Sequence, residues 1–257
     1  MKVVILAGGF GTRLSEETTL KPKPMVTIGG KPILWHIMKM YSSYGYNEFV
    51  ILLGYKGYII KEYFFNYFLH ESDFEINLSN NNVEILNKQN LNWKVSLIDT
   101  GENTMTGGRI KKIENLIGNN TFLLTYGDGL ANINLDLLLK FHKSHNKIIT
   151  VTSAQPDARF GSLQINDDNK VESFQEKPKG DGSWINAGFF VCEPKVFEFI
   201  KDSEDEIFEQ SPLRNLAKAS ELYTYKHHDF WMPMDTLRDK NKLESLWDSK
   251  LAPWKIW

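Results

Sequence analysis

The sequence holds a single cysteine, Cys192, so no disulfide can form within the chain. This cysteine ends the apolar run Gly188-Phe189-Phe190-Val191-Cys192, where burial in the core is the usual role of an unpaired cysteine. No hydrophobic run reaches the length that spans a bilayer, and the first residues enter an expected strand without a signal peptide. We therefore predict a cytoplasmic protein that does not bind membranes.

An excess of charge of one sign is also missing. The formal net charge is −2, which argues against the basic surface of a nucleic-acid-binding protein. Histidine is scarce, with six in 257 residues, and no set of cysteines and histidines has the spacing of a transition-metal site. Any anion-binding charge must therefore be local.

The pattern of apolar residues predicts an alternation of strands and helices through the first 150 residues. Strands are expected near 2–7, 48–53, 94–98, 121–126 and 148–153. Helical spacing follows Pro32, which is expected at the first helical position, and it recurs over 57–69 and 236–248. Residues 71–93 predict a hairpin insertion, and short strands are expected near 162–165, 171–174 and 186–191.

These elements predict an α/β fold, a Rossmann-like mixed, mainly parallel sheet flanked by helices, with small β insertions. We expect one domain over residues 1–257, with no linker that would divide it. Residues 1–153 would mainly bind one substrate, and residues 154–257, with the C-terminal helix and tail, would mainly bind the second. The many aromatics of 57–69 are equally compatible with a large core and with contact to a partner subunit.

A glycine turn with nearby cations follows the first expected strand. The stretch from Val3 to Leu14 reads VVILAGGFGTRL, and its glycines allow backbone N–H groups to approach a phosphate closely. Positive charge comes from Arg13, Lys21 and Lys23. This combination predicts a phosphate-binding site, whereas a plain strand-to-helix turn would not need the cations.

Two other glycine-loop sites fit poorly. A dinucleotide-binding fingerprint needs a third glycine where Leu14 stands, which is too large for close packing of helix on strand. A Walker A loop needs a hydroxyl after Gly-Lys, but Pro32 follows Gly30-Lys31.

Two aspartates in apolar surroundings predict a metal site. Asp128 stands between Gly127 and Gly129 at the end of the expected strand 121–126, and Asp235 lies in the run Trp231-Met232-Pro233-Met234. Two carboxylates together with phosphate oxygens suit Mg²⁺. As an alternative, Asp235 could cap the helix that follows it. A second anion-binding loop is predicted from Thr104 to Arg109, before a helix expected from Ile110 onward.

Four segments together resemble the motifs of the sugar-1-phosphate nucleotidyltransferases: Leu6 to Leu14, Lys21 to Met25, Tyr126 to Gly129, and Phe174 to Pro178. Further segments resemble the branch of that family that transfers cytidylyl groups from CTP to glucose 1-phosphate: Ser15 to Leu20, Thr106 to Arg109, Phe230 to Lys240, and Ala252 to Lys255. Members that use dTTP or UTP usually carry a proline soon after Thr-Arg-Leu, where Ser15 stands here. The resemblance therefore favours CTP, with dTTP or UTP as the alternative.

The resemblance implies a reaction of CTP with glucose 1-phosphate that gives CDP-glucose and pyrophosphate, with Mg²⁺ as cofactor. It also implies a homo-oligomer, expected to be a hexamer, that supplies dideoxysugars for bacterial surface polysaccharide (O-antigen and lipopolysaccharide). Two other functions fit the sequence less well. A non-catalytic nucleotide-sensing subunit would not need the full set of charges, and Leu14 argues against a nicotinamide oxidoreductase.

The same resemblance implies site residues. Catalytic roles fall to Arg13, Lys23 and Asp128, and Mg²⁺ would be held by Asp128 and Asp235. The sugar phosphate would contact Lys177, with Glu176 and Asn186 on the sugar hydroxyls. The nucleotide would contact Leu6, Ala7, Gly8, Gly9, Gly11, Thr12, Arg13, Lys23, Thr104, Arg109 and Gly127.

Overall fold

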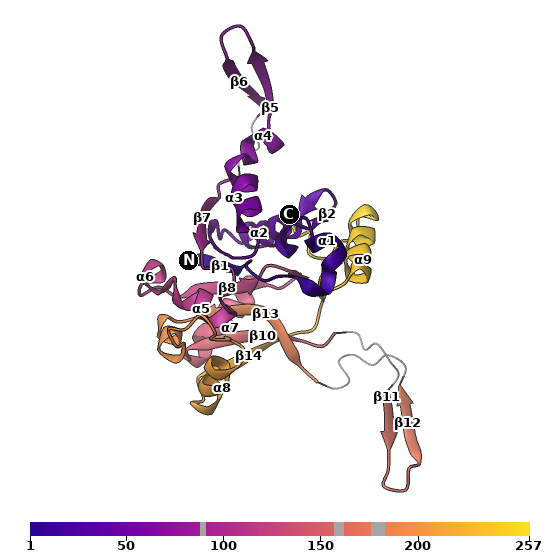
Figure 1. Cartoon of the computed structure of the whole chain (residues 1–257). Helices are drawn as coiled ribbons and strands as arrows, with labels where there is room; N and C mark the ends of the chain where they lie inside the picture. Colours follow the sequence, from indigo (N-terminus) through magenta and orange to yellow (C-terminus); the bar gives the residue numbers. More distant parts are fainter. Residues whose placement is uncertain (88–90, 157–161, 176–182) are drawn as a thin grey trace.

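One seven-stranded sheet forms the centre of the computed structural model, which describes residues 1–87, 91–156, 162–175 and 183–257 (Figure 1). β13 runs antiparallel to β10 and β8, and the other neighbouring strands are parallel. The prediction of a mixed, mainly parallel sheet is confirmed. In spatial order the strands are β14 (Leu222–His227), β10 (Ile149–Ala154), β13 (Ile185–Cys192), β8 (Phe122–Tyr126), β1 (Lys2–Leu6), β4 (Glu48–Leu53) and β7 (Lys94–Asp99).

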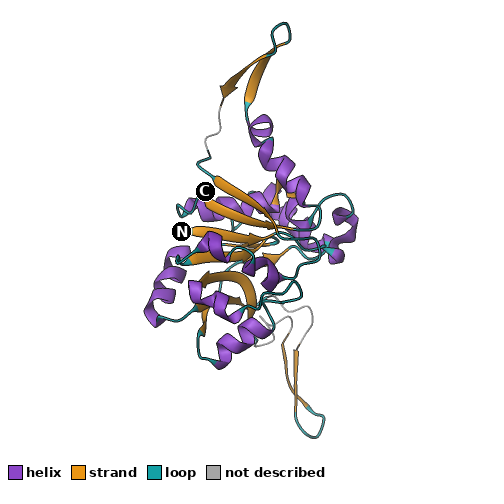
Figure 2. Ribbon diagram, turned by 60° about the vertical axis from the view of Figure 1, so that its left-hand side comes forward, coloured by secondary structure: helices purple, strands orange, loops and turns teal. Residues whose placement is uncertain are grey.

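Helices cover both faces of the sheet, as Figure 2 shows. The alternation of side chains along β1 sends Val3 and Ile5 into one core and Val4 and Leu6 into the other. The first core includes residues of α2 (Ile33–Ser43), α3 (Gly57–Phe65), α7 (Leu135–His145) and α9 (Leu237–Asp248). The second includes residues of α5 (Thr106–Lys111), α6 (Glu114–Ile117), the 3-10 helix η4 (Pro194–Phe199) and α8 (Ser211–Lys218).

The predicted strands lie within one residue of the observed ones, and Cys192 is buried in β13 as expected. Two helix starts differ from the prediction. Pro32 is the residue that precedes α2, with an extended backbone, because it also pairs in the short β2–β3 ribbon (Thr27–Ile28 and Lys31–Pro32). The helix expected from Ile110 begins at Thr106.

The insertion predicted at 71–93 is the hairpin of β5 (Asp73–Asn77) and β6 (Asn82–Asn87). It projects away from the sheet, and a second hairpin, β11 (Ser162–Ile165) with β12 (Val171–Gln175), projects from a different part of the molecule (Figure 1).

The aromatic segment that precedes the β5–β6 hairpin divides into α3 and α4 (Tyr67–Glu71). Tyr63 and Phe64 pack against the core, whereas Phe65 is 83% exposed, so neither alternative fits the whole segment. No helix among the described residues has the length and hydrophobicity needed to span a membrane.

His36, in the middle of α2, is fully buried among tryptophans of the C-terminal part of the chain. Its Nε2 donates to the carbonyl of Ile28 at 2.8 Å, and its Nδ1 accepts from the indole of Trp254 at 3.4 Å. Burial lowers the pKa of His36 to about 4. His36 therefore links α2 to Trp254 only while its ring is neutral, because a protonated Nδ1 would face the indole N–H of Trp254, which is also a donor.

We expect a pH-dependent loss of stability from this histidine. Its pKa is lower in the folded state than in the unfolded chain, so its contribution is complete above about pH 6.5 and is lost as the pH falls toward 4. A depression of this size corresponds to about 3 kcal/mol. Urea unfolding at pH 7.5 and 4.5 should show a smaller pH dependence for His36→Gln than for the parent, while exposed His228→Gln serves as control. An unchanged pH dependence in His36→Gln would contradict this assignment.

Candidate active site

A cavity of about 600 Å³ opens at the carboxyl ends of β1 and β8, the edge where open α/β sheets bind ligands. Most of the site residues predicted from sequence line it together. Arg13 lies in the 3-10 helix η1 (Thr12–Leu14), directly after the glycine loop, but its side chain is not among those described. Glu176 and Lys177 lie outside the described residues. Those on the cavity wall are Leu6, Ala7, Gly8, Gly9, Gly11, Thr12, Lys23, Thr104, Arg109, Gly127, Asp128, Asn186 and Asp235.

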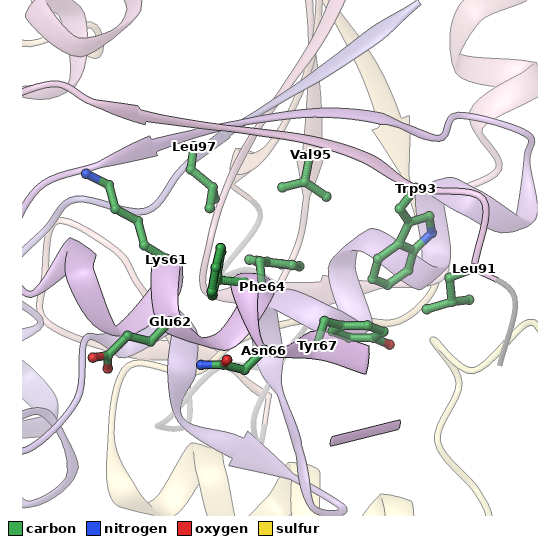
Figure 3. Close-up of a pocket in the computed structure, with 10 residues that line it drawn as sticks. Lys61, Glu62, Phe64, Asn66, Tyr67, Leu91, Trp93, Val95 and Leu97 are labelled. Atoms are coloured by element: carbon green, nitrogen blue, oxygen red, sulfur yellow. The ribbon is translucent and has the colours of Figure 1, made fainter. Parts of the chain in front are cut away.

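A second hollow, of about 650 Å³, lies between α3, α4 and β7 (Figure 3). The side chains of Phe64, Tyr67 and Trp93 face it together with aliphatic side chains of β7. Its lining is mainly apolar, so it lacks the phosphate-binding character of the first cavity.

The structure explains differently why glycine stands at each position of the predicted phosphate loop. Gly11 has a φ of +67°, in the left-handed region that glycine adopts without strain. A Cβ on Gly8 would lie 2.4 Å from the guanidinium carbon of Arg109, so glycine is needed there for close packing. Gly9 has open space around it and could carry a side chain.

Arg109 extends from α5 beneath this loop and is almost fully buried. Its Nη1 donates to the carbonyls of Leu53 and Gly101, at 2.8 and 2.7 Å, and to the hydroxyl of Thr100. Its Nη2 donates to the carbonyls of Gly8 and Glu102, both at 3.0 Å. The guanidinium thus joins the end of β4 to the loops that follow β1 and β7. That it also touches a nucleotide stays a prediction.

Lys23, in the 3-10 helix η2 (Lys23–Met25), joins the two predicted metal ligands. Its Nζ lies 2.6 Å from Asp128 Oδ2 and 2.7 Å from Asp235 Oδ1. Burial alone would lower the pKa of Lys23, but the charges and hydrogen bonds of both aspartates outweigh it and raise that pKa above its ordinary value. Lys23 therefore stays charged between them.

The two aspartates meet because β9 (Gly129–Ala131) pairs with β15 (Trp231–Pro233), which places Gly129 opposite Pro233. The cap of α9 is Thr236, whose hydroxyl accepts from the N–H of Asp239 in a capping box. The alternative in which Asp235 caps this helix is therefore wrong, and its carboxylate contacts Lys23 instead.

The donor set fits a divalent cation. Two convergent carboxylates already hold one cation, the Lys23 ammonium, and Mg²⁺ commonly takes one or two carboxylates together with phosphate oxygens and waters. The described charged side chains of the cavity wall, Lys23, Arg109, Glu102, Asp128, Glu209 and Asp235, have a net formal charge of −2. This wall needs further positive charge before it can hold a polyanion. Among the residues that the structure describes, three or more candidate ligands do not converge anywhere.

Among the wall residues that were not predicted from sequence, Tyr126 and Glu209 form a hydrogen-bonded pair. Tyr126, at the end of β8, donates to Glu209 Oε1 at 2.5 Å and accepts from Asn186 Nδ2 at 3.2 Å. Glu209 lies in the loop before α8 in the run Asp205-Glu206-Ile207-Phe208-Glu209, which reads as an ordinary acidic loop. No short-range pattern marked it, since its partners are 83 and 103 residues away.

Comparisons with known proteins agree with this arrangement. The sequence model of the nucleotidyl transferase family matches residues 2–249. The chain is 55% identical over 258 residues to the glucose-1-phosphate cytidylyltransferase of Salmonella typhimurium, and 46% identical over 257 residues to a probable glucose-1-phosphate cytidylyltransferase of Bacillus subtilis. Each match covers all of both chains.

A solved structure, HddC from Yersinia pseudotuberculosis, has the same fold, with a TM-score of 0.69 and 26% identity over 96% of this chain and 99% of that one. The family match covers nearly the whole sequence, including the glycine loop, Lys23 and both aspartates. This chain belongs to the nucleotidyl transferase family.

Proposed function

We propose that this enzyme transfers a cytidylyl group from CTP to α-D-glucose 1-phosphate, giving CDP-glucose and pyrophosphate. The observation that carries the proposal is Lys23 bound by Asp128 and Asp235 beside a glycine loop at the carboxyl edge of the sheet. The choice of CTP and glucose 1-phosphate is supported by the full-length similarity to the two cytidylyltransferases.

In the proposed reaction an oxygen of the sugar phosphate attacks the α-phosphorus of CTP, and the bond to the pyrophosphate leaving group breaks. The second pKa of a phosphate monoester is about 6, so the nucleophile is already mostly ionised at neutral pH. A general base is therefore unnecessary. The enzyme must instead bring two anions together and neutralise the charge that develops on the leaving group.

Lys23 can supply part of that charge. Its ammonium pairs with both Asp128 and Asp235. A divalent cation held by these two carboxylates would polarise the phosphate oxygens and stabilise the leaving group. Lys23 would then be able to bind phosphate oxygens of the nucleotide. The glycine loop, fixed by Arg109, would line the nucleotide, and Asn186 would hydrogen-bond the sugar.

We further propose that Mg²⁺ is the cation and that the enzyme works in the cytoplasm as a homo-oligomer, with a hexamer and surface-polysaccharide synthesis as expectations from the family resemblance. Association is supported by exposed apolar side chains of α4 and the β5–β6 hairpin, such as Phe68 and Leu78.

The substrate choice is tested by supplying glucose 1-phosphate and Mg²⁺ with CTP, UTP, dTTP, ATP or GTP in separate reactions. We expect pyrophosphate release chiefly with CTP, and CDP-glucose as the sugar nucleotide identified by mass spectrometry. A preference for dTTP or UTP would keep the mechanism and overturn the nucleotide. Absence of release with all five would favour a sensing subunit.

Replacing Lys23 by methionine removes the ammonium and keeps most of the side-chain volume. We expect kcat to fall on the order of 10²–10³-fold, the size seen when one preorganised charge-stabilising donor is lost. The matched control is Lys140→Met, because Lys140 is an exposed lysine of α7 that does not line the cavity. If both variants turn over alike, Lys23 has no role in the reaction.

Replacing Asp128 by asparagine keeps the shape but removes one charged ligand. We expect weaker metal binding, measured as Mn²⁺ affinity by electron paramagnetic resonance, and a matching rise in the metal concentration that supports half-maximal turnover. The control is Asp136→Asn on the first turn of α7, away from the cavity. Unchanged Mn²⁺ affinity in Asp128→Asn would rule out this carboxylate as a metal ligand.

A further inference from the structure

Glu209 ends two chains of hydrogen bonds that begin on opposite sides of the cavity. Its Oε1 accepts from Tyr126 at 2.5 Å, and its Oε2 accepts from the hydroxyl of Thr106 at 2.6 Å. Thr106 is the first residue of α5, the helix that also carries Arg109. The carboxylate therefore connects the predicted nucleotide side of the cavity with the end of β8.

The direction of each hydrogen bond is determined by backbone groups. The N–H of Gly188 donates to Asn186 Oδ1 at 2.8 Å, so the Nδ2 of that amide faces Tyr126. Tyr126 accepts this hydrogen bond and has its own proton left for Glu209. Likewise, Thr106 accepts from the N–H of Phe208 at 2.9 Å and has its hydroxyl proton left for Glu209.

Both chains thus need an acceptor that donates nothing in return. An ionised carboxylate has two such oxygens, whereas an amide in the same place would present one acceptor and one donor. Burial and the neighbouring Glu209 charge raise the pKa of Tyr126, so its hydroxyl keeps its proton and remains a donor. The requirement is therefore specific for glutamate at position 209 and not only for a polar side chain.

The ring of Tyr126 is also held firmly in place. Gly188 has a φ of +83°, and a Cβ built on it would lie 2.4 Å from the Tyr126 ring. Phe190 packs edge-on against the same ring, with centroids 6.0 Å apart. The hydroxyl consequently stays at one place, where it fixes the Asn186 amide and leaves one amide N–H for a ligand.

We propose that Glu209 is a positioning residue for the sugar: through Tyr126 it holds the Nδ2 end of the Asn186 amide, whose Oδ1 end accepts from the Gly188 N–H, so that the remaining amide N–H faces a hydroxyl of the glucose 1-phosphate. This inference rests on the proposed function, in which Asn186 contacts the sugar. Glu209 acts on the reaction without touching a reacting atom. Its loss should therefore weaken sugar-phosphate binding more than nucleotide binding.

The test compares Glu209→Gln, Tyr126→Phe and the double variant with the parent, with Asp205→Asn as a matched change of an exposed carboxylate in the same loop. The KM for each substrate is measured with the other saturating and Mg²⁺ present, after thermal unfolding has verified that each variant is folded. We expect the KM for glucose 1-phosphate to rise about tenfold in each single variant, the size of one lost hydrogen bond, with the KM for CTP within twofold.

Because both side chains act in one sequence of contacts, the double variant should be no worse than either single variant. Additive effects, equal changes in both KM values, or an unchanged KM for glucose 1-phosphate in folded Glu209→Gln would each overturn the positioning role. A failure of the proposed function is distinguished from these results by the parent protein, which would then form no CDP-glucose from CTP.

A binding measurement gives an independent readout. Titration calorimetry with CDP and with CDP-glucose gives the ratio of the two affinities in each protein. The two ligands differ in the glucose and in one charge of the terminal phosphate, and the charge difference is the same for the parent and the variant. The ratio of CDP-glucose affinity to CDP affinity should be about tenfold lower in Glu209→Gln than in the parent, while CDP affinity stays within twofold. An equal ratio in both proteins would also overturn the proposal.

Discussion

The buried guanidinium of Arg109 is the interaction on which the site depends most. Its side chain donates to four carbonyl oxygens, one at the end of β4 and three in the loops after β1 and β7, and to the hydroxyl of Thr100. A guanidinium that is almost fully buried would be costly without such partners. Burial lowers the pKa of Arg109, and nearby Asp99 and Glu204 oppose that effect. The residue stays charged, since its ordinary pKa is far above neutrality, and Gly8 must lack a side chain to make room for it.

A second constraint is electrostatic. The described charged side chains of the cavity are mainly acidic, although the proposed substrates are both anions. Two of these carboxylates, Asp128 and Asp235, are paired with Lys23, which offsets part of the cost of bringing them together. In the proposed reaction a nucleotide with its cation would bring in further positive charge, and Lys23 would then be able to bind phosphate.

The sequence predicted best what depends on short-range pattern. Apolar runs located the strands, and glycines between apolar and charged residues located the loop of Gly8 to Gly11 and the carboxylate of Asp128. Three details failed or were missed, and two of them depend on neighbouring residues. Pro32 pairs with Thr27 in a short ribbon, and Thr236 caps α9 in a capping box with Asp239, a short-range pattern that marks Thr236 and not Asp235 as the cap. Glu209 is different, because its partners are 83 and 103 residues away and local spacing does not determine where an acidic loop folds.

The two sides of the cavity are connected through the end of β8. Tyr126 contacts Asn186, Asp128 contacts Lys23, and Gly127 between them donates its N–H to the carbonyl of Leu6 at 2.9 Å. A Cβ on Gly127 would lie 2.9 Å from that same oxygen, so the ends of β8 and β1 can meet this closely only at glycine. An in-line displacement between two bound phosphates requires a fixed relation of the two binding sites. In this fold β1 and β8 pair in parallel as far as Leu6 and Tyr126, and the Gly127–Leu6 hydrogen bond extends that pairing to the cavity. The paired strand ends would thus help to keep the two proposed binding sites at a fixed distance.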